Sequence, residues 1–262
     1  MIQYRILETG FFVADGGVMF GAVPKRAWKR AYPIDDDGNC RLAMNCLLVW
    51  NGKRVVLLDT GVGDKSLGKL SYYNFRNLKD IVELVYSYGF EPEQVTDVVL
   101  SHLHFDHCGG CTYVLDNQLN ITFPKARHWV SKLQWETFMN PNELELHSYR
   151  SQDMMPVFEA GLVRLIDKDV ELFDGFNLSL FDGHTKGQIV SFIDLGKKET
   201  LLFPGDVIPT KAHLSDSWIS AYDIEPLESL AAKKRIKEWT DGENVIHIFY
   251  HDAYQTDITF LQ

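Results

Sequence analysis

The chain has 262 residues, of which 45% are hydrophobic and 24% are charged, and its formal net charge is −10. This composition is that of a soluble globular protein, and its acidic balance disfavours a nucleic-acid partner because like charges repel. No apolar run approaches the roughly 20 residues of a membrane helix, and no basic segment precedes an apolar one near Met1. Four cysteines in this length make no disulfide framework, so we expect a cytoplasmic protein without a membrane partner.

The first half of the sequence favours strands joined by short turns. Leu42–Trp50 and Arg54–Leu58 are rich in apolar residues and flank Asn51-Gly52, the dipeptide most typical of a tight hairpin. A helix is predicted near Asn77–Tyr88, where apolar residues recur at helical spacing. The short apolar strand Thr96–Leu100 then leads directly into a cluster of histidines.

The second half of the sequence mixes strands and helices. The pattern predicts strands at Ala126–Val130, Ile189–Asp194, Glu199–Phe203 and Val245–Tyr250, and helices near Ser131–Met139, Asp153–Ala160 and Pro226–Trp239. Strands mixed with helices and hairpins indicate an α/β fold built of layers. No linker rich in Pro, Gly or Ser divides the chain, so we predict a single domain over residues 1–262.

Four potential metal ligands lie within six residues, directly after the strand that ends at Leu100. They are His102, His104, Asp106 and His107. In an extended segment His102 and His104 face the same way, while Asp106 and His107 can turn toward a second point nearby. Four ligands from so short a segment exceed what one tetrahedral ion takes from it, which favours two adjacent ions.

Four further polar residues follow the ends of other apolar runs. They are Asp59, His184, Asp206 and His251. Polar residues that leave the ends of buried strands converge on one rim of a sheet, where α/β proteins usually place their sites. We therefore expect these residues to join the histidine cluster.

The pattern His102-x-His104-x-Asp106-His107, with later Gly183-His184, Gly205-Asp206 and His251, resembles the metallo-β-lactamase-fold superfamily over nearly the whole chain. The resemblance implies an αββα sandwich with the site at one edge of the two sheets. It also implies that His102, His104 and His184 hold one ion, that Asp106, His107 and His251 hold the other, and that Asp206 bridges them. Asp59, in Asp59-Thr60-Gly61, is implied to orient a ligating histidine without touching an ion.

The residue types at a few ligand positions distinguish the subgroups of this superfamily. An aspartate at position 206 resembles the two-metal hydrolases, whereas β-lactamases carry Cys or Ser there and flavodiiron proteins carry Glu where His104 stands. The ligand order is most similar to the N-acyl-homoserine lactonases, which implies an ester or lactone as the small-molecule substrate and suggests a homodimer. Those lactonases place a Tyr three residues after the bridging Asp, where this chain has Pro209.

Two divalent ions are the expected cofactors, most simply zinc, with iron or manganese as alternatives because His and Asp ligands suit all three. A hydroxide that bridges the ions would attack the substrate, and Asp106 would pass a proton to the leaving group. Asp206 would hold the ions together. His213 is a candidate donor to the substrate oxygen in place of the missing Tyr.

Other functions stay open at this stage. The same ions could cleave phosphoesters or phosphotriesters, a single iron could support a persulfide dioxygenase, and the site could serve a non-catalytic binding module. Two ions per chain would favour hydrolysis, and one iron with thiol-dependent O₂ uptake would favour the dioxygenase.

Two segments outside the ligand set have more than one interpretation. Cys108-Gly109-Gly110-Cys111 has the spacing of a redox pair, but it directly follows His107, and small residues that pack beneath a metal loop explain it better. Gly17–Pro24 carries apolar residues that could belong to the core, to a substrate wall or to a dimer contact. We favour the core for this segment.

Overall fold

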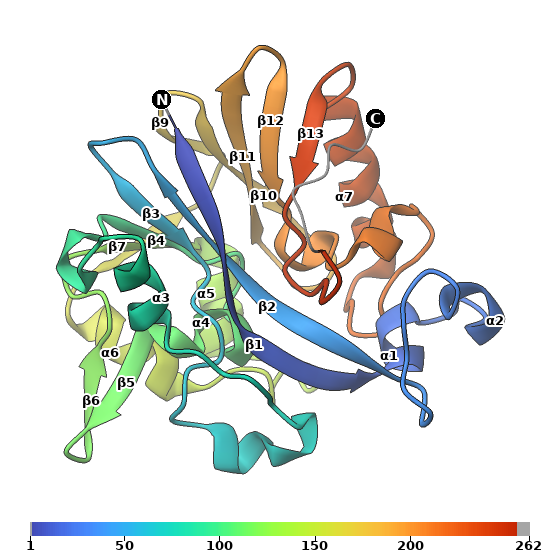
Figure 1. Ribbon diagram of the computed structural model, residues 1–262, viewed down its shortest axis with the longest axis horizontal. Helices are drawn as coiled ribbons and strands as arrows, with labels where there is room; N and C mark the ends of the chain where they lie inside the picture. The colour runs from blue at the N-terminus through green and yellow to red at the C-terminus, as the bar shows by residue number, and fades with distance from the viewer. Residues whose placement is uncertain (1, 256–262) are drawn as a thin grey trace.

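Two β-sheets face each other in the computed structural model, which describes residues 2–255, and helices cover their outer faces (Figure 1). The buried residues between the sheets come from both of them, as in Leu57 of the first sheet and Leu178 and Ile193 of the second. This arrangement confirms the predicted α/β layers and the αββα sandwich.

The first sheet is mixed. Its strands, in spatial order, are β1 (Gln3–Asp15), β2 (Asn39–Trp50), β3 (Val55–Leu58), β4 (Asp97–Val99), β7 (Arg127–Ser131) and β8 (Val163–Ile166). β1, β2 and β3 pair antiparallel with one another, and β3, β4, β7 and β8 pair parallel. The predicted hairpin joins β2 to β3: Asn51 Oδ1 accepts from the backbone N–H of Lys53 and Arg54, and Gly52 takes a φ of 83°.

The second sheet is mostly antiparallel. Its order is β13 (Asn244–His247), β12 (Glu199–Phe203), β11 (Gln188–Gly196), β10 (Phe176–Phe181) and β9 (Val170–Phe173), with only β12 and β13 parallel. The strand predicted over Val245–Tyr250 therefore ends three residues early, at His247, and the rest of that segment leads to the site. A separate two-stranded ribbon consists of β5 (Thr112–Leu115) and β6 (Gln118–Ile121).

The helices lie on the outside of the sheets and between strands. They are α1 (Gly16–Phe20), α2 (Lys25–Trp28), α3 (Ile81–Ser87), α4 (Phe105–Cys108), α5 (Lys132–Met139), α6 (Ser151–Glu159) and α7 (Pro226–Trp239), with 3₁₀ turns η1 (Leu67–Tyr73), η2 (Pro92–Gln94), η3 (Gly109–Cys111), η4 (Gly205–Val207) and η5 (Lys211–Leu214). Helix α5 packs on β7 and β8, whereas α7 covers the second sheet through Ala232 and Ile236. Within the described residues no helix is both long and apolar enough to cross a membrane.

Helix α3 begins later than the sequence pattern predicts. The helix was expected from Asn77, but Asn77 has a left-handed φ of 51°, and Asp80 caps the helix by accepting from the N–H of Val82 at 2.7 Å. Aspartate is a preferred residue at this position because its carboxylate satisfies an N–H that the first turn leaves unpaired. The cap therefore sets the start of the helix.

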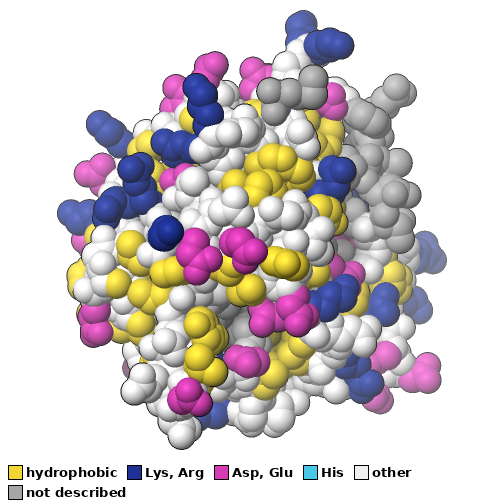
Figure 2. Space-filling view, turned by 60° about the vertical axis from the view of Figure 1, so that its left-hand side comes forward, with side chains coloured by type: hydrophobic (Ala, Val, Ile, Leu, Met, Phe, Trp, Pro, Cys, Tyr) yellow, Lys and Arg dark blue, Asp and Glu magenta, His cyan; other side chains and the backbone are white. Residues whose placement is uncertain are grey.

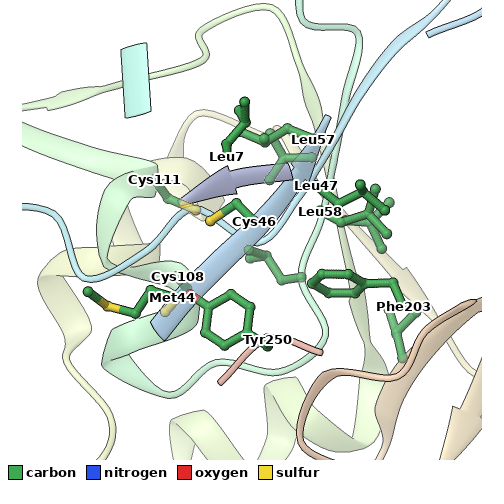
Figure 3. Packing of buried hydrophobic residues seen from close by; sticks show 14 of the residues in the cluster. Leu7, Met44, Cys46, Leu47, Leu57, Leu58, Cys108, Cys111, Phe203 and Tyr250 are labelled. Atoms are coloured by element: carbon green, nitrogen blue, oxygen red, sulfur yellow. The ribbon is translucent and has the colours of Figure 1, made fainter. Parts of the chain in front are cut away.

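The two cysteines beside the histidine cluster belong to the core. Figure 3 shows Cys108 and Cys111 among buried side chains that include Cys46 and Tyr250. Burial raises the pKa of Cys111 to about 12 and that of Cys108 well above its usual value, so both thiols stay protonated and unreactive at neutral pH. Gly109 packs so closely on the backbone of Val62 that a Cβ would lie 2.2 Å from the Val62 oxygen. These contacts favour the packing interpretation over a redox pair.

On the molecular face drawn in Figure 2, apolar side chains are scattered between acidic and basic ones.

Candidate metal centre

The structure brings all seven predicted ligands to one place, at the ends of four strands. His102 follows β4, His184 follows β10, Asp206 lies in the turn η4 after β12, and His251 follows β13. The remaining three, His104, Asp106 and His107, lie at or within the short helix α4. All seven are buried, with at most 8% of their surface exposed. Polar residues at strand ends therefore converge as the sequence pattern predicts.

The nitrogens of the first group lie close enough together to coordinate one metal ion. His104 Nδ1 lies 3.0 Å from His102 Nε2 and 3.2 Å from His184 Nε2. Ligands about 2.0–2.1 Å from a zinc ion at tetrahedral angles are ~3.4 Å apart, so these three nitrogens could surround one ion. The same three residues form a group whose donor atoms all lie within 4.8 Å of one another.

The second group consists of Asp106, His107 and His251. Asp106 Oδ2 lies 3.7 Å from His107 Nε2 and 3.5 Å from His251 Nε2. These distances are also close to the edge of a tetrahedron around one ion. The three residues form another group of possible ligands.

Asp206 lies between the two groups. Its Oδ1 is 3.5 Å from His107 Nε2, and its Oδ2 is 3.3 Å from His251 Nε2 and 3.4 Å from His184 Nε2. A carboxylate with contacts to both groups can serve as a ligand beside either, and Asp206 forms a further group of possible ligands with His102 and His107. Among the described residues, the buried His107 Nε2 and Asp206 Oδ1 have no hydrogen-bond partner. Buried polar atoms are rarely left unpaired, and a metal ion would satisfy both.

Asp59 orients His107, as the resemblance implies. The Nδ1 of His107 donates to Asp59 Oδ2 at 2.8 Å, which leaves Nε2 facing the other ligands. The backbone N–H and the hydroxyl of Ser101 also donate to the Asp59 carboxylate, each at 2.7 Å. Asp59 has a φ of 56°, a strained conformation for a residue other than glycine. Such strain persists where surrounding contacts hold it, and here they hold a carboxylate on a histidine.

Two further carboxylates that the sequence did not reveal orient other histidines. His104 Nε2 donates to Glu145 Oε1 at 3.4 Å, and His184 Nδ1 donates to Asp223 Oδ1 at 3.1 Å. Hydrogen bonds of this kind fix the tautomer and the orientation of a metal-ligating imidazole. Glu145 and Asp223 lie in irregular segments, far along the chain from the histidines that they contact. No sequence pattern predicts their role.

The pKa shifts of the ligands differ from one another. Although burial lowers the pKa of both His107 and His184, the neighbouring carboxylates raise that of His107 well above its usual value and that of His184 above its usual value, so a metal ion would displace protons there. Burial, reinforced by the charge of His107, lowers the pKa of His102 well below its usual value, so its imidazole is neutral at pH 7. Burial alone would raise the pKa of Asp206, but His251 and His107 hold it well below the usual range. Neutral imidazole and ionised carboxylate are the forms that coordinate a metal.

A cavity of about 350 Å³ opens onto five of the seven residues: His104, Asp106, His184, Asp206 and His251. Its other walls are mainly apolar and aromatic. Val18 and Met19 are among them, so the segment Gly17–Pro24 contributes both to the core, through Met19 and Phe20, and to the cavity wall. Pro209 lines the cavity where the resembling lactonases have a tyrosine.

The structure does not support His213 as a donor to the substrate. Its side chain is 1% exposed, and both ring nitrogens are engaged. Nε2 donates to the backbone oxygen of Met19 at 2.8 Å, and Nδ1 accepts from the hydroxyl of Thr210 at 2.7 Å. The ring is stacked on Phe20, with centroids 4.8 Å apart. The catalytic role predicted for His213 is therefore wrong, because no polar atom of the ring is available to the cavity.

Comparison with known proteins places this geometry in a family. Residues 41–260 match the model of the metallo-beta-lactamase superfamily. An N-acyl homoserine lactonase of Bacillus thuringiensis is 25% identical over 221 residues, which cover 80% of this chain and 81% of the relative.

Solved structures share the fold. A probable metal-dependent hydrolase from Staphylococcus aureus superimposes with a TM-score of 0.89 at 26% identity, covering 96% of this chain and 89% of that one. A dizinc quorum-quenching lactonase, solved with the product N-hexanoyl-L-homoserine, gives a TM-score of 0.74 at 23% identity over 97% of this chain and 88% of the other. With the sandwich and the converging His and Asp residues, the match over most of the chain leads to one conclusion: the chain belongs to the metallo-beta-lactamase superfamily.

Proposed function

We propose that the chain is a hydrolase of esters or lactones whose centre holds two divalent ions, most simply zinc. The position of Asp206 supports this proposal most strongly, because its two oxygens reach ligands of both groups. His102, His104 and His184 would hold one ion, and Asp106, His107 and His251 the other. When bound, such ions polarise a carbonyl oxygen and supply a nucleophile by lowering the pKa of water to roughly 7.

The protein's own residues would orient the substrate and move a proton. Asp106 lines the cavity, and the hydroxyl of Tyr250 donates to its backbone oxygen, which fixes the start of α4. A carboxylate held at the cavity floor is suited to passing a proton to the leaving group. The apolar walls would exclude water from the reacting bond, which strengthens the polar interactions there.

The relatives' names suggest a lactone as the substrate. The residue at position 209, which lines the cavity, bears on this choice. Pro209 offers neither a hydroxyl nor an N–H to the cavity that it lines. A donor to the substrate oxygen at this position is therefore missing. The proposal accordingly covers esters and lactones in general, within a cytoplasmic enzyme that we expect to form a homodimer.

Metal content and turnover test the proposal together. The purified protein is stripped with a chelator, reloaded with zinc, manganese or iron, and assayed on lactones, thioesters, aryl esters and phosphotriesters. We expect two ions per chain and ester or lactone hydrolysis that disappears on stripping and returns on reloading. Hydrolysis that survives complete removal of the metal would overturn the proposal, and one iron per chain with thiol-dependent O₂ uptake would replace it with a dioxygenase.

Asp206→Asn is the sharpest variant for this test. It keeps the shape of the side chain but removes the charge that both ligand groups contact, so we expect less than two ions per chain and loss of turnover. Asp216→Asn is a matched control, because Asp216 pairs with Lys237 on the surface and is neither a proposed ligand nor among the residues that line the cavity. An Asp206→Asn protein that retains both ions and full turnover would contradict the bridging role.

A further inference from the structure

A second cavity, of about 550 Å³, shares no lining residue with the cavity over the candidate metal centre. Its walls include α3 and the residues just before it, parts of the segment 60–67, and the β5–β6 ribbon. Figure 1 shows α3 and the ribbon at the left of the molecule. Small-molecule sites usually have volumes of roughly 300–1,000 Å³. This cavity therefore has the volume of a small-molecule site that the proposed hydrolysis does not use.

Four threonines in the wall of this cavity are buried. Three of them donate their hydroxyl groups to backbone oxygens: Thr9 to Met44 at 3.1 Å, Thr60 to His107 at 3.0 Å and Thr112 to Gln152 at 2.8 Å. The fourth is Thr122, which is 6% exposed and whose Oγ1 has no hydrogen-bond partner among the described residues. Buried polar atoms are rarely left unpaired in native proteins. The Thr122 hydroxyl is therefore available to an acceptor on a bound molecule.

The charged side chains of this cavity lie at its rim rather than in its interior. All four are exposed: Asp64, Lys79, Asp80 and Glu93. Lys79 Nζ pairs with Glu8 at 3.1 Å. The Asp80 carboxylate accepts from the N–H of Val82. The buried part of the wall holds no charged residue, so a charged group that entered it would lose its hydration without gaining a partner. The interior thus favours an uncharged molecule.

Apolar side chains make up much of the wall. Val62 and Ile81 are buried there, whereas Tyr113 and Val114 of β5 are 39% and 47% exposed although both line the cavity. A bound molecule that covers this surface removes it from water, which stabilises the bound state in proportion to the apolar area covered. The Tyr113 ring can also pack against another aromatic ring, edge-to-face or offset. The wall therefore suits a molecule with aromatic rings.

We propose that this second cavity binds an uncharged aromatic molecule that carries one hydrogen-bond acceptor. The rings contact Val62, Ile81 and Val114, and the acceptor takes a hydrogen bond from the Thr122 hydroxyl. Because Oγ1 of Thr122 has no partner, rotation of this side chain about χ1 toward the acceptor breaks no hydrogen bond. The inference goes beyond the proposed hydrolysis and does not depend on it.

Benzophenone is a suitable probe, because it has two phenyl rings, one carbonyl oxygen and no charge. Under near-ultraviolet light it also forms a covalent bond to C–H groups that it contacts, so proteolysis and mass spectrometry of the full-length protein locate its site. We expect the labelled peptides to come from residues 78–82 and 112–122. Ligand-observed NMR should show that benzophenone binds about tenfold more tightly than diphenylmethane, which has the same rings without the oxygen.

Two adjacent residues of β5 make the test specific. Val114→Asp places a carboxylate in the apolar wall, so we expect it to weaken the binding of benzophenone by about tenfold or more. Leu115→Asp is the matched control, because neighbouring side chains of a strand point to opposite faces and Leu115 does not line the cavity. It should change the affinity by less than about twofold.

Thr122→Val removes the hydroxyl and keeps the shape of the side chain. Since this hydroxyl has no partner within the described residues, its removal breaks no hydrogen bond of the folded protein. We expect the variant to bind benzophenone and diphenylmethane with affinities that differ by less than about twofold, because neither probe then has a donor to bond.

The outcomes separate this site from the metal centre. Labelling confined to residues outside the second cavity would overturn the proposal, as would equal binding by Val114→Asp and Leu115→Asp. A preference for benzophenone that persists in Thr122→Val would refute the hydrogen bond from its hydroxyl. The expected labelling in a protein that hydrolyses no ester or lactone would support the second site and overturn only the proposed function.

Discussion

The carboxylate of Glu145 holds the imidazole of His104 from the side opposite the candidate metal centre. The Nε2 of His104 lies 3.4 Å from Glu145 Oε1, and its Nδ1 faces His102 and His184. The hydroxyl of Tyr149 donates to the same carboxylate oxygen at 2.8 Å. His104 thus directs its Nδ1 toward the candidate metal centre, whereas His102 and His184 direct their Nε2 atoms toward it.

Removal of this carboxylate should weaken the first metal site. We expect Glu145→Ala to lower the affinity for the ion that His102, His104 and His184 are proposed to hold by about 10- to 100-fold, because the imidazole of His104 loses the partner that fixes its tautomer. Competition with a chromophoric chelator measures this affinity. Glu143→Ala is the matched control, since Glu143 is exposed on the same loop. Equal affinity in Glu145→Ala and the control would show that the pair has no influence on the ion.

Asp59→Asn should weaken the second site while preserving the backbone. Asparagine tolerates the left-handed conformation that Asp59 adopts, so the substitution removes the charge without new strain. An amide cannot accept all three hydrogen bonds from Ser101 and His107, and one buried donor would then face another. We expect a loss of about 1–3 kcal/mol in the free energy of unfolding and weaker binding of one ion. Urea unfolding and chelator competition measure the two effects, and a stable variant with unchanged metal affinity would contradict the role of Asp59.

The sequence alone predicts the ligands better than the residues that support them. The segment from His102 to His107 is recognisable because four ligands lie within six residues, and its placement after a short apolar strand locates it at a sheet edge. Asp59 is also predictable, because it follows the next strand of the same sheet. Glu145 and Asp223 are not, since each reaches its histidine from an irregular loop about 40 residues distant.

The failed prediction for His213 has a physical cause. A polar loop residue after Asp206 suggests a position near the substrate, but the turn η5 directs the imidazole inward, onto Phe20. Whether a histidine faces a cavity or the core depends on contacts with a segment almost 200 residues earlier in the chain. Long-range packing of this kind leaves no periodicity in the sequence.

A buried ion pair anchors the loop that carries the ligands. Lys65 Nζ lies 2.8 Å from Asp153 Oδ1 and donates to the backbone oxygens of Gly109 and Thr112. Both side chains are at most 2% exposed. Lys65→Met would leave a buried carboxylate without a partner, so we expect it to lose about 3–5 kcal/mol in the free energy of unfolding.

A double-mutant cycle separates the pair from its surroundings. Lys65→Met with Asp153→Asn should recover part of the loss, because the second substitution removes the unpaired charge. Lys69→Met is the surface control. Equal stability of Lys65→Met and Lys69→Met in chemical denaturation would refute the anchoring role.

The buried His128 should make the protein sensitive to acid. Its side chain is fully buried, and burial lowers its pKa to about 4, against 6.5 for a free imidazole. Between these values the unfolded chain binds the proton and the folded protein does not, so stability falls as the pH drops below 6.5. The contribution between pH 7 and pH 5 is about 2 kcal/mol for this one residue. Urea unfolding measures the free energy of unfolding at pH 7 and at pH 5. The difference between the two values should be smaller in His128→Gln than in the original protein. The same difference in both proteins would contradict this role of His128.

His213 should influence substrate binding through the cavity wall rather than take part in the reaction. It connects Met19, which lines the cavity, to Thr210, which lies just after Pro209 in the same wall. His213→Phe keeps a ring on Phe20 but removes both hydrogen bonds, so we expect the KM for long acyl esters to rise about tenfold, with kcat changed by less than about threefold. Short esters should show a smaller change, because a shorter acyl group contacts less of the cavity wall. His147→Phe is the control, because His147 is exposed and outside the cavity lining. A fall in kcat at unchanged KM, equal for short and long esters, would instead return His213 to a direct role in the reaction.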